Sequence, residues 1–322
     1  MEYLVLFSAA ALLAACFVTN KLYEKNAGTS LEAGFGFNIM LGFLAASIFF
    51  VAGGLRFDIS PYSMIMATIL TVLVVNNTLL GFRIIKNGSV SVYTLFLMSG
   101  GMLVPYIYGW LFLNEEISVG RTVGIIIFIC AVALSSYTGR GKKIKISSLL
   151  MCIAVFISNG FVSVTSNLHQ KEYLKYSEGV EGAFAAVDAT HFVVLSGVAK
   201  IAVCGIVLGV LLLVKKYIKK PALPAENAPA EGTDERKLDL KSDWWKLLII
   251  IVAAAVLDGV SYFLQLKSAE LLPATVVYPL LTGATIVFMP IAAFLAFREK
   301  PTKYIVISVA LSFVATLLFI FF

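Results

Sequence analysis

Charged residues are scarce in this sequence. Asp, Glu, Lys and Arg together make up 14% of its 322 residues, whereas apolar residues make up 60%. An ordinary soluble domain has about 25% charged and about 45–50% apolar residues. With so few charges, the chain cannot cover a hydrophobic core with a surface that water solvates well. The composition excludes an ordinary soluble protein and indicates a lipid environment.

The sequence also lacks the groupings that carry most enzyme chemistry. Its four cysteines and two histidines show no metal-ligand spacing, and it contains no P-loop, no glycine-rich dinucleotide turn and no nucleophile elbow. We therefore expect no metal, no cofactor, no enzymatic activity and no ATP-driven step within this chain. An intramembrane acid–base enzyme that uses Asp258, Lys200 and the histidines is the weaker alternative.

Long hydrophobic stretches are abundant. An apolar helix of about 20 residues crosses the roughly 30 Å hydrocarbon core of a bilayer. We predict an all-α polytopic membrane protein whose spans lie at residues 3–20, 36–54, 62–84, 88–113, 118–137, 146–168, 186–214, 246–266, 271–297 and 302–322. The first block has no basic leader and is followed by further spans, which disfavours a signal peptide.

Basic residues are distributed unevenly between the predicted loops. Most of the 25 Lys and Arg residues lie in or beside the loops that follow the first, third, fifth, seventh and ninth spans. Such loops face the cytoplasm, so ten spans place both termini on the other side. Topology then explains the net charge of +6, and we expect no nucleic-acid partner. The segment 215–243 has too little apolar content to fold, which predicts a disordered linker.

The two halves of the chain share a pattern. Val18-Thr19 with Leu22 and Lys25 recurs as Val164-Thr165 with Leu168 and Lys171. Each half ends with a proline-bearing span, a short charged turn and a final span: Pro105 with Asn114-Glu115-Glu116, then Pro290 with Arg298-Glu299-Lys300. Two five-span units must lie upside down relative to each other, and inverted repeats build alternating-access sites. We predict units at 1–137 and 146–322, joined by a basic loop at 138–145.

The charged turn of the first half resembles a known family motif. Leu113-Asn114-Glu115-Glu116-Ile117-Ser118 leads into Gly120-Arg121-Thr122-Val123-Gly124. This segment is similar to the leucine-glycine-glutamate turn and glycine-bearing fifth helix of EamA-type members of the drug/metabolite transporter superfamily, with Asn114 in place of the turn glycine. The resemblance implies ten helices in two inverted units and termini in the cytoplasm. The loop charges indicate the opposite orientation, which we follow.

Two full charges fall far from either end of a predicted span. They are Lys200 and Asp258, and each costs about 2.5–3.5 kcal/mol at the centre of a bilayer on insertion scales. Ser261, Tyr262 and Gln265 share the helix face of Asp258. We predict that these groups serve substrate binding or coupling. The alternative is a structural ion pair between two helices.

Further polar and aromatic side chains inside spans are candidates for the same site: Asn76, Asn77, Asn159, Ser163, Asn167, Tyr93, Tyr106 and Tyr278. Interhelical hydrogen bonding, worth about 0.6 kcal/mol on average in membranes, is at least as good an interpretation for any single asparagine or serine. His191, with Asp188 one turn before it, predicts either a proton relay or, preferably, a solvated interfacial pair.

These observations predict a secondary transporter that moves a small polar metabolite, such as an amino acid, by alternating access, with export as the expected direction. A multidrug or lipophilic-cation exporter is the alternative. The expected partners are a small-molecule substrate and the lipid bilayer. We expect a monomer or homodimer in the inner membrane of the cell.

Overall fold

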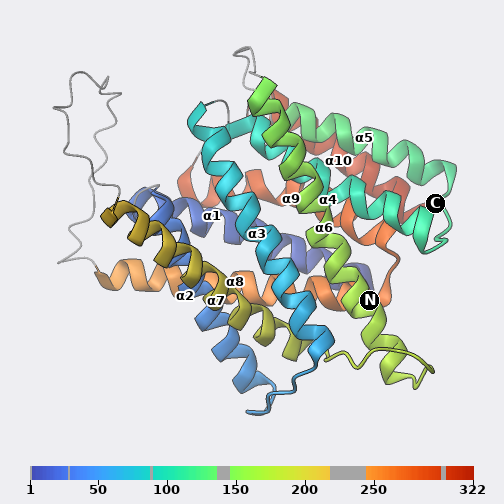
Figure 1. Ribbon diagram of the computed structural model, residues 1–322. Helices are drawn as coiled ribbons and strands as arrows, with labels where there is room; N and C mark the ends of the chain where they lie inside the picture. Colours follow the sequence, from blue (N-terminus) through green and yellow to red (C-terminus); the bar gives the residue numbers. More distant parts are fainter. Residues whose placement is uncertain (1, 28–29, 88–89, 136–145, 218–243, 299–301) are drawn as a thin grey trace.

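The structure, a computed structural model, describes residues 2–27, 30–87, 90–135, 146–217, 244–298 and 302–322 (Figure 1). Within these ranges the chain forms ten α-helices and no β-strand. The helices are α1 (Glu2–Ala27), α2 (Leu31–Ala52), α3 (Pro61–Asn87), α4 (Val90–Phe112), α5 (Val119–Ser135), α6 (Ile146–Ser177), α7 (Ala189–Tyr217), α8 (Trp244–Leu271), α9 (Ala274–Phe297) and α10 (Lys303–Phe321).

Among these described helices, nine are long and apolar enough to cross a membrane, and α5 is an apolar helix of 17 residues. The chain is an all-α polytopic membrane protein, so the predicted fold class is confirmed. The start of α1 and the end of α10 lie on the same side of the molecule in Figure 1. The basic loop at 138–145 and residues 218–243 of the predicted linker lie outside the described residues.

Several helices continue beyond the spans predicted from hydropathy. Helix α1 ends at Ala27 instead of residue 20, and α6 ends at Ser177 instead of residue 168. Hydropathy detects the part of a helix that matches hydrocarbon, whereas backbone hydrogen bonds continue through polar turns beyond it. Helix α8 begins at Trp244, which with Trp245 is exposed, in the position where indole rings meet lipid headgroups.

The main helix contacts join one half of the chain to the other, and they form a symmetric set. Helix α2 packs on α7, α4 on α9 and α5 on α10, and each pair joins helices that hold the same position in the two predicted units (Figure 1). The other main contacts form matched pairs: α1 on α8 with α6 on α3, α4 on α6 with α9 on α1, and α2 on α8 with α7 on α3. Exchanging the halves leaves these contacts unchanged, whereas the smaller contact of α6 with α8 has no comparable counterpart between α1 and α3. The two-unit organisation stays a prediction, which this correspondence favours.

Two apolar clusters divide the bundle, and each contains helices from both halves. One joins α1, α4, α5, α9 and α10, around the fully buried rings of Phe128 and Phe319. The other joins α2, α3, α7 and α8 around Phe192. Helix α6 contributes only the partly buried Val162 to these two clusters. It also contributes the buried Cys152 and Val155 to a smaller apolar cluster with α3 and α4, and polar contacts add to this packing.

Helices α2 and α7 cross at a pair of glycines. A Cβ atom at Gly197 would lie 2.6 Å from the carbonyl oxygen of Gly42, and one at Gly42 would lie 2.8 Å from that of Gly197. Both distances are shorter than real Cβ contacts, and the neighbouring atoms are backbone that cannot move aside. Glycine at both positions sets the separation of the two helices, as small residues do at membrane helix crossings.

We expect Gly197→Ala to destabilise the protein by about 1–3 kcal/mol, because overpacking forces the crossing apart. The measurement is thermal unfolding of the purified protein in detergent. Gly205→Ala on the same helix is the matched control, since a Cβ there would meet no atom within 4 Å. Equal stability of the two variants would contradict this account of the crossing.

Candidate functional site

Lys200 and Asp258, the two charges predicted inside spans, lie together near the middle of α7 and α8. The Lys200 Nζ donates a hydrogen bond of 3.4 Å to Asp258 Oδ2. The Sγ of Cys16, on α1, lies 4.0 Å from the other carboxylate oxygen. The pair thus joins a helix of the first half to two helices of the second. The Lys200 side chain is 20% exposed and that of Asp258 is 32% exposed, so the described protein does not fully enclose the pair.

The polar stripe that follows Asp258 on α8 connects to helices on both sides. Ser261 is fully buried and donates to the carbonyl oxygen of Ala9 on α1 at 2.9 Å. Gln265 donates to the Ser261 hydroxyl at 3.1 Å. The Tyr262 hydroxyl forms a hydrogen bond of 3.2 Å with Ser166 on α6. The stripe therefore links the charge pair to α1 and α6.

Four of the predicted polar residues make interhelical hydrogen bonds. On α6, Asn159 donates to the carbonyl oxygen of Leu97 on α4 at 2.8 Å, and Ser163 donates to that of Gly101 at 3.2 Å. On α3, Asn77 donates to Asn159 and Asn76 donates to Ser158, both at 3.3 Å. These contacts hold α3, α4 and α6 together and match the packing alternative left open by the sequence.

Apart from Tyr262, the predicted tyrosines lie in apolar surroundings. Tyr106 and Tyr278 are buried in the cluster around Phe128. Tyr93 packs against the first half of the bundle, where a Cβ at Gly81 would lie 2.8 Å from its ring. The positions of these well-packed tyrosines give no reason to assign them to the site.

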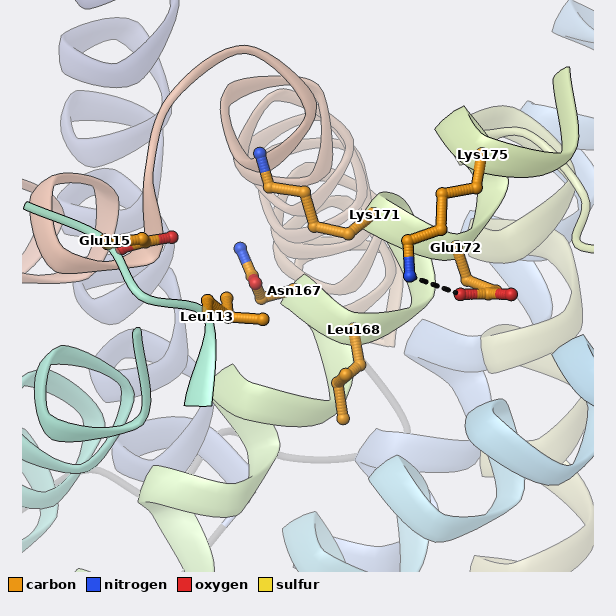
Figure 2. A pocket seen from close by; sticks show the side chains of 7 residues that line it. All are labelled: Leu113, Glu115, Asn167, Leu168, Lys171, Glu172 and Lys175. Atoms are coloured by element: carbon orange, nitrogen blue, oxygen red, sulfur yellow. Dashed lines mark hydrogen bonds and ion pairs between the residues drawn. The ribbon is translucent and has the colours of Figure 1, made fainter. Parts of the chain in front are cut away.

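Asn167 differs from the other predicted asparagines. Its side chain is fully buried, and neither its Nδ2 nor its Oδ1 has a hydrogen-bond partner among the described residues. It lines a cavity of about 260 Å³ at the end of the bundle where α6 ends and α9 begins (Figure 2). The walls are Leu113, Glu115, Asn167, Leu168, Lys171, Glu172 and Lys175.

Sequence reasoning missed most of this cavity. Leu168 and Lys171 were identified only as parts of the repeated pattern, and Glu115 only as part of the charged turn. Hydropathy assigned Lys171, Glu172 and Lys175 to a loop, whereas they belong to the last turns of α6. The repetition of Lys25 as Lys171 was the signal available in the sequence.

Glu115 anchors the loop between α4 and α5 to the start of α9. Its two carboxylate oxygens accept hydrogen bonds from the backbone N–H groups of Ala274 and Thr275, at 2.9 and 2.8 Å. These N–H groups have no acceptor within the helix, and the positive end of the helix dipole favours the carboxylate. Pro273 precedes the helix and supplies no side-chain cap. Glu115 therefore caps α9 from a distant part of the chain.

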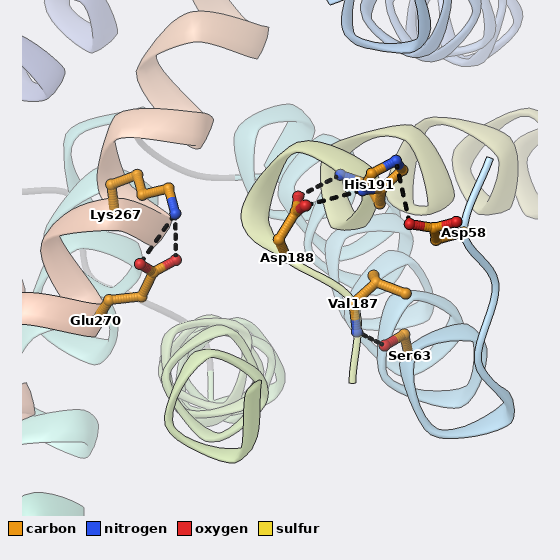
Figure 3. Close-up of polar contacts among 7 residues, drawn as sticks. All are labelled: Asp58, Ser63, Val187, Asp188, His191, Lys267 and Glu270. Carbon is orange, nitrogen blue, oxygen red and sulfur yellow. Dashed lines mark hydrogen bonds and ion pairs between the residues drawn. The ribbon is translucent and has the colours of Figure 1, made fainter. Parts of the chain in front are cut away.

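The same end of the bundle carries an interfacial histidine (Figure 3). Asp188 precedes α7, accepts from the His191 backbone N–H at 3.0 Å and contacts its Nδ1 at 2.9 Å. Asp58 lies 3.7 Å from Nε2 on the other side of the ring. Burial raises the pKa of the Asp188 carboxyl, but these hydrogen bonds outweigh it and hold the pKa below its usual value. The structure places the two side chains in contact, and an interfacial pair stays a prediction.

We expect Glu115→Ala to destabilise the protein by about 0.5–2 kcal/mol, as loss of a helix cap does. The neighbouring Glu116 is exposed, so Glu116→Ala removes the same charge without removing the cap and is the matched control. Thermal unfolding in detergent measures both. If Glu116→Ala destabilised the protein as much as Glu115→Ala does, the assignment of Glu115 as the cap of α9 would be wrong.

We expect Asp258→Asn and Lys200→Met to be coupled by about 0.5–3 kcal/mol, because removing either partner leaves the other charge without compensation. Partial exposure of both groups screens the charge and favours the lower part of that range. A double-mutant cycle of unfolding free energies measures the coupling. Additive single effects would mean that the two side chains act independently.

No protein-family model matches this chain, and no curated protein matches it. One solved crystal structure is similar to this chain, with a TM-score of 0.70. The similarity covers 98% of this chain and 95% of the chain in that structure. The two sequences are 11% identical. The likeness therefore establishes a shared fold along nearly the whole chain and carries no substrate or reaction.

Proposed function

We propose that this protein is a secondary transporter of a small polar metabolite that works by alternating access, in the manner of the drug/metabolite transporter superfamily that its charged turn resembles. The observation that carries the proposal is the partly exposed Lys200–Asp258 pair. Charges at this depth are costly in lipid, and they serve substrate or ion pathways in membrane proteins as a rule.

The arrangement of the helices supports an alternating motion. The matched contacts of the two halves fit an inverted repeat, whose members can exchange conformations to open the site on either face. Each apolar cluster combines helices from both halves, so the two clusters are units that can rock against each other. Side chains of α1, α7 and α8 meet at the charge pair. Helix α1 belongs to the cluster around Phe128, and α7 and α8 belong to the cluster around Phe192.

The polar character of the site favours a polar substrate over a lipophilic one. Asp258, Ser261, Tyr262 and Gln265 form a continuous stripe of hydrogen-bonding groups on α8, whereas a multidrug exporter needs apolar and aromatic walls. The described residues contain no group of three or more His, Cys, Asp or Glu side chains that could hold a metal ion. We place the protein in the inner membrane. The loop charges support an orientation with both termini outside the cytoplasm, and we propose export as the direction of transport.

Transport by the purified protein in liposomes tests the proposal. With an inward or outward pH gradient, we expect uptake of at least one labelled solute from a panel of amino acids and small organic acids. Asp258→Asn should reduce the rate at least about tenfold if the carboxylate takes part in binding or coupling, which corresponds to roughly 1.4 kcal/mol.

The matched control is Asp58→Asn, which removes the same charge from a loop carboxylate whose side chain is 70% exposed. It should leave transport unchanged. Transport of lipophilic cations but no polar solute would replace the proposal by the multidrug alternative. Full transport by Asp258→Asn and by Lys200→Met, with unaltered pH dependence, would remove the role of the charge pair.

A further inference from the structure

We propose that the cavity between the α4–α5 loop and the last turns of α6 binds the carboxylate group of a small organic solute, held by Lys171 and the side-chain amide of Asn167. As a substrate site the cavity rests on the proposed function; as a carboxylate-binding site it does not. Its volume is about 260 Å³. A water molecule takes up about 30 Å³ of liquid, and pockets for drug-sized ligands begin at about 300 Å³. The occupant is therefore larger than a water molecule and smaller than a drug.

Asn167 provides the first indication of a ligand. A primary amide offers two donors and an acceptor, and buried polar atoms are satisfied in native structures as a rule. Neither amide atom of Asn167 has a partner among the described residues, although the side chain is fully buried. Figure 2 shows the amide in the cavity between Glu115 and Lys171. Donors in this position are suited to an oxygen of the occupant.

Lys171 provides the charge. Within the described part of the chain its ammonium makes one long hydrogen bond, 3.5 Å to the carbonyl oxygen of Leu272, and no ion pair. That contact leaves N–H donors of the ammonium available. A lysine ammonium beside an amide donor, in a small and partly closed space, provides charge-assisted hydrogen bonds to a carboxylate.

The acidic residues near Lys171 form their hydrogen bonds and ion pairs with other groups, and Glu270, just outside the wall, pairs with Lys267 at 2.9 Å. Glu115 directs both carboxylate oxygens to the backbone N–H groups at the start of α9, where the helix terminus compensates its charge. Glu172 forms a 3.3 Å ion pair with Lys175 and also accepts from the backbone of Phe184 at 2.8 Å. One cation is thus left without a paired anion, which favours a monovalent anionic group over phosphate.

Three probes that share the same branched alkyl chain distinguish the functional groups: L-leucine, 4-methylpentanoate, which lacks the amino group, and 3-methylbutylamine, which lacks the carboxylate. Equilibrium dialysis with each labelled probe measures binding to the purified full-length protein in detergent. We expect the two carboxylates to bind and the amine not to bind. Preference for L-leucine over 4-methylpentanoate would identify amino acids as the source of the carboxylate, and the reverse would identify simple organic acids.

We expect Lys171→Met to weaken carboxylate binding at least about tenfold, and Lys171→Arg to restore most of it, because arginine keeps the charge and the donors. Asn167→Leu, nearly equal in volume, should also weaken binding while leaving the thermal unfolding temperature unchanged or raised, since it removes two unpaired polar atoms from a buried position. Lys216→Met, on the exposed last turn of α7, is the matched control for charge and should bind as the unaltered protein does.

Binding of the amine at the strength of the acids, or no binding of either acid, would overturn the carboxylate assignment. Equal binding by Lys171→Met and the unaltered protein would do the same. If the acids bind through Lys171 but are not transported in liposomes, the binding site stands and the transport proposal fails for these solutes. If another solute is transported and neither cavity variant affects it, the transporter stands and the cavity is not its substrate site.

Discussion

The hydrocarbon core of a bilayer offers no hydrogen-bond partners, and this constraint governs every polar group in the bundle. Ser261 meets it with the carbonyl oxygen of Ala9, Asn159 with that of Leu97 and Ser308 with that of Ala131. Each of these bonds joins two helices. A polar side chain inside a span therefore fixes a neighbouring helix unless its surroundings supply another partner. Asn167 is one of several buried side chains, with Tyr106, Ser196 and Ser312, that have a polar atom to which the described protein supplies none.

Charges meet the same constraint in different ways according to depth. At mid-depth, Lys200 and Asp258 compensate each other and remain partly exposed. At the end of the bundle, Glu115 is compensated by the N-terminus of α9, and Asp188 by the N–H and ring of His191. Lys171 has only a long contact to a carbonyl oxygen. The charge left least compensated and the amide left without partners share one cavity, which is why the cavity is a candidate binding site.

Close helix approach makes the polar contacts possible. A Cβ at Gly101 would lie 2.7 Å from Asn159 Nδ2, so glycine on α4 gives the asparagine of α6 access to the α4 backbone. Gly42 and Gly197 do the same for α2 and α7, which bring Lys200 against α2. Helix α6 is held by these polar and small-residue contacts together with the apolar cluster of Cys152 and Val155 against α3 and α4.

The sequence by itself determined the class of protein, the helices and the two charges that needed a partner, because hydropathy and the cost of charge in lipid act locally along the chain. It left open whether each asparagine packs or binds. Asn159 and Asn167 lie on the same helix, yet one has partners and the other has none. Only the tertiary structure decided between them, since the partners belong to α3 and α4. The same holds for Glu115, whose acceptor role depends on the start of α9, more than 150 residues away in the chain. A hydrogen bond needs two groups within about 3 Å, and a sequence names the groups without giving the distance between them.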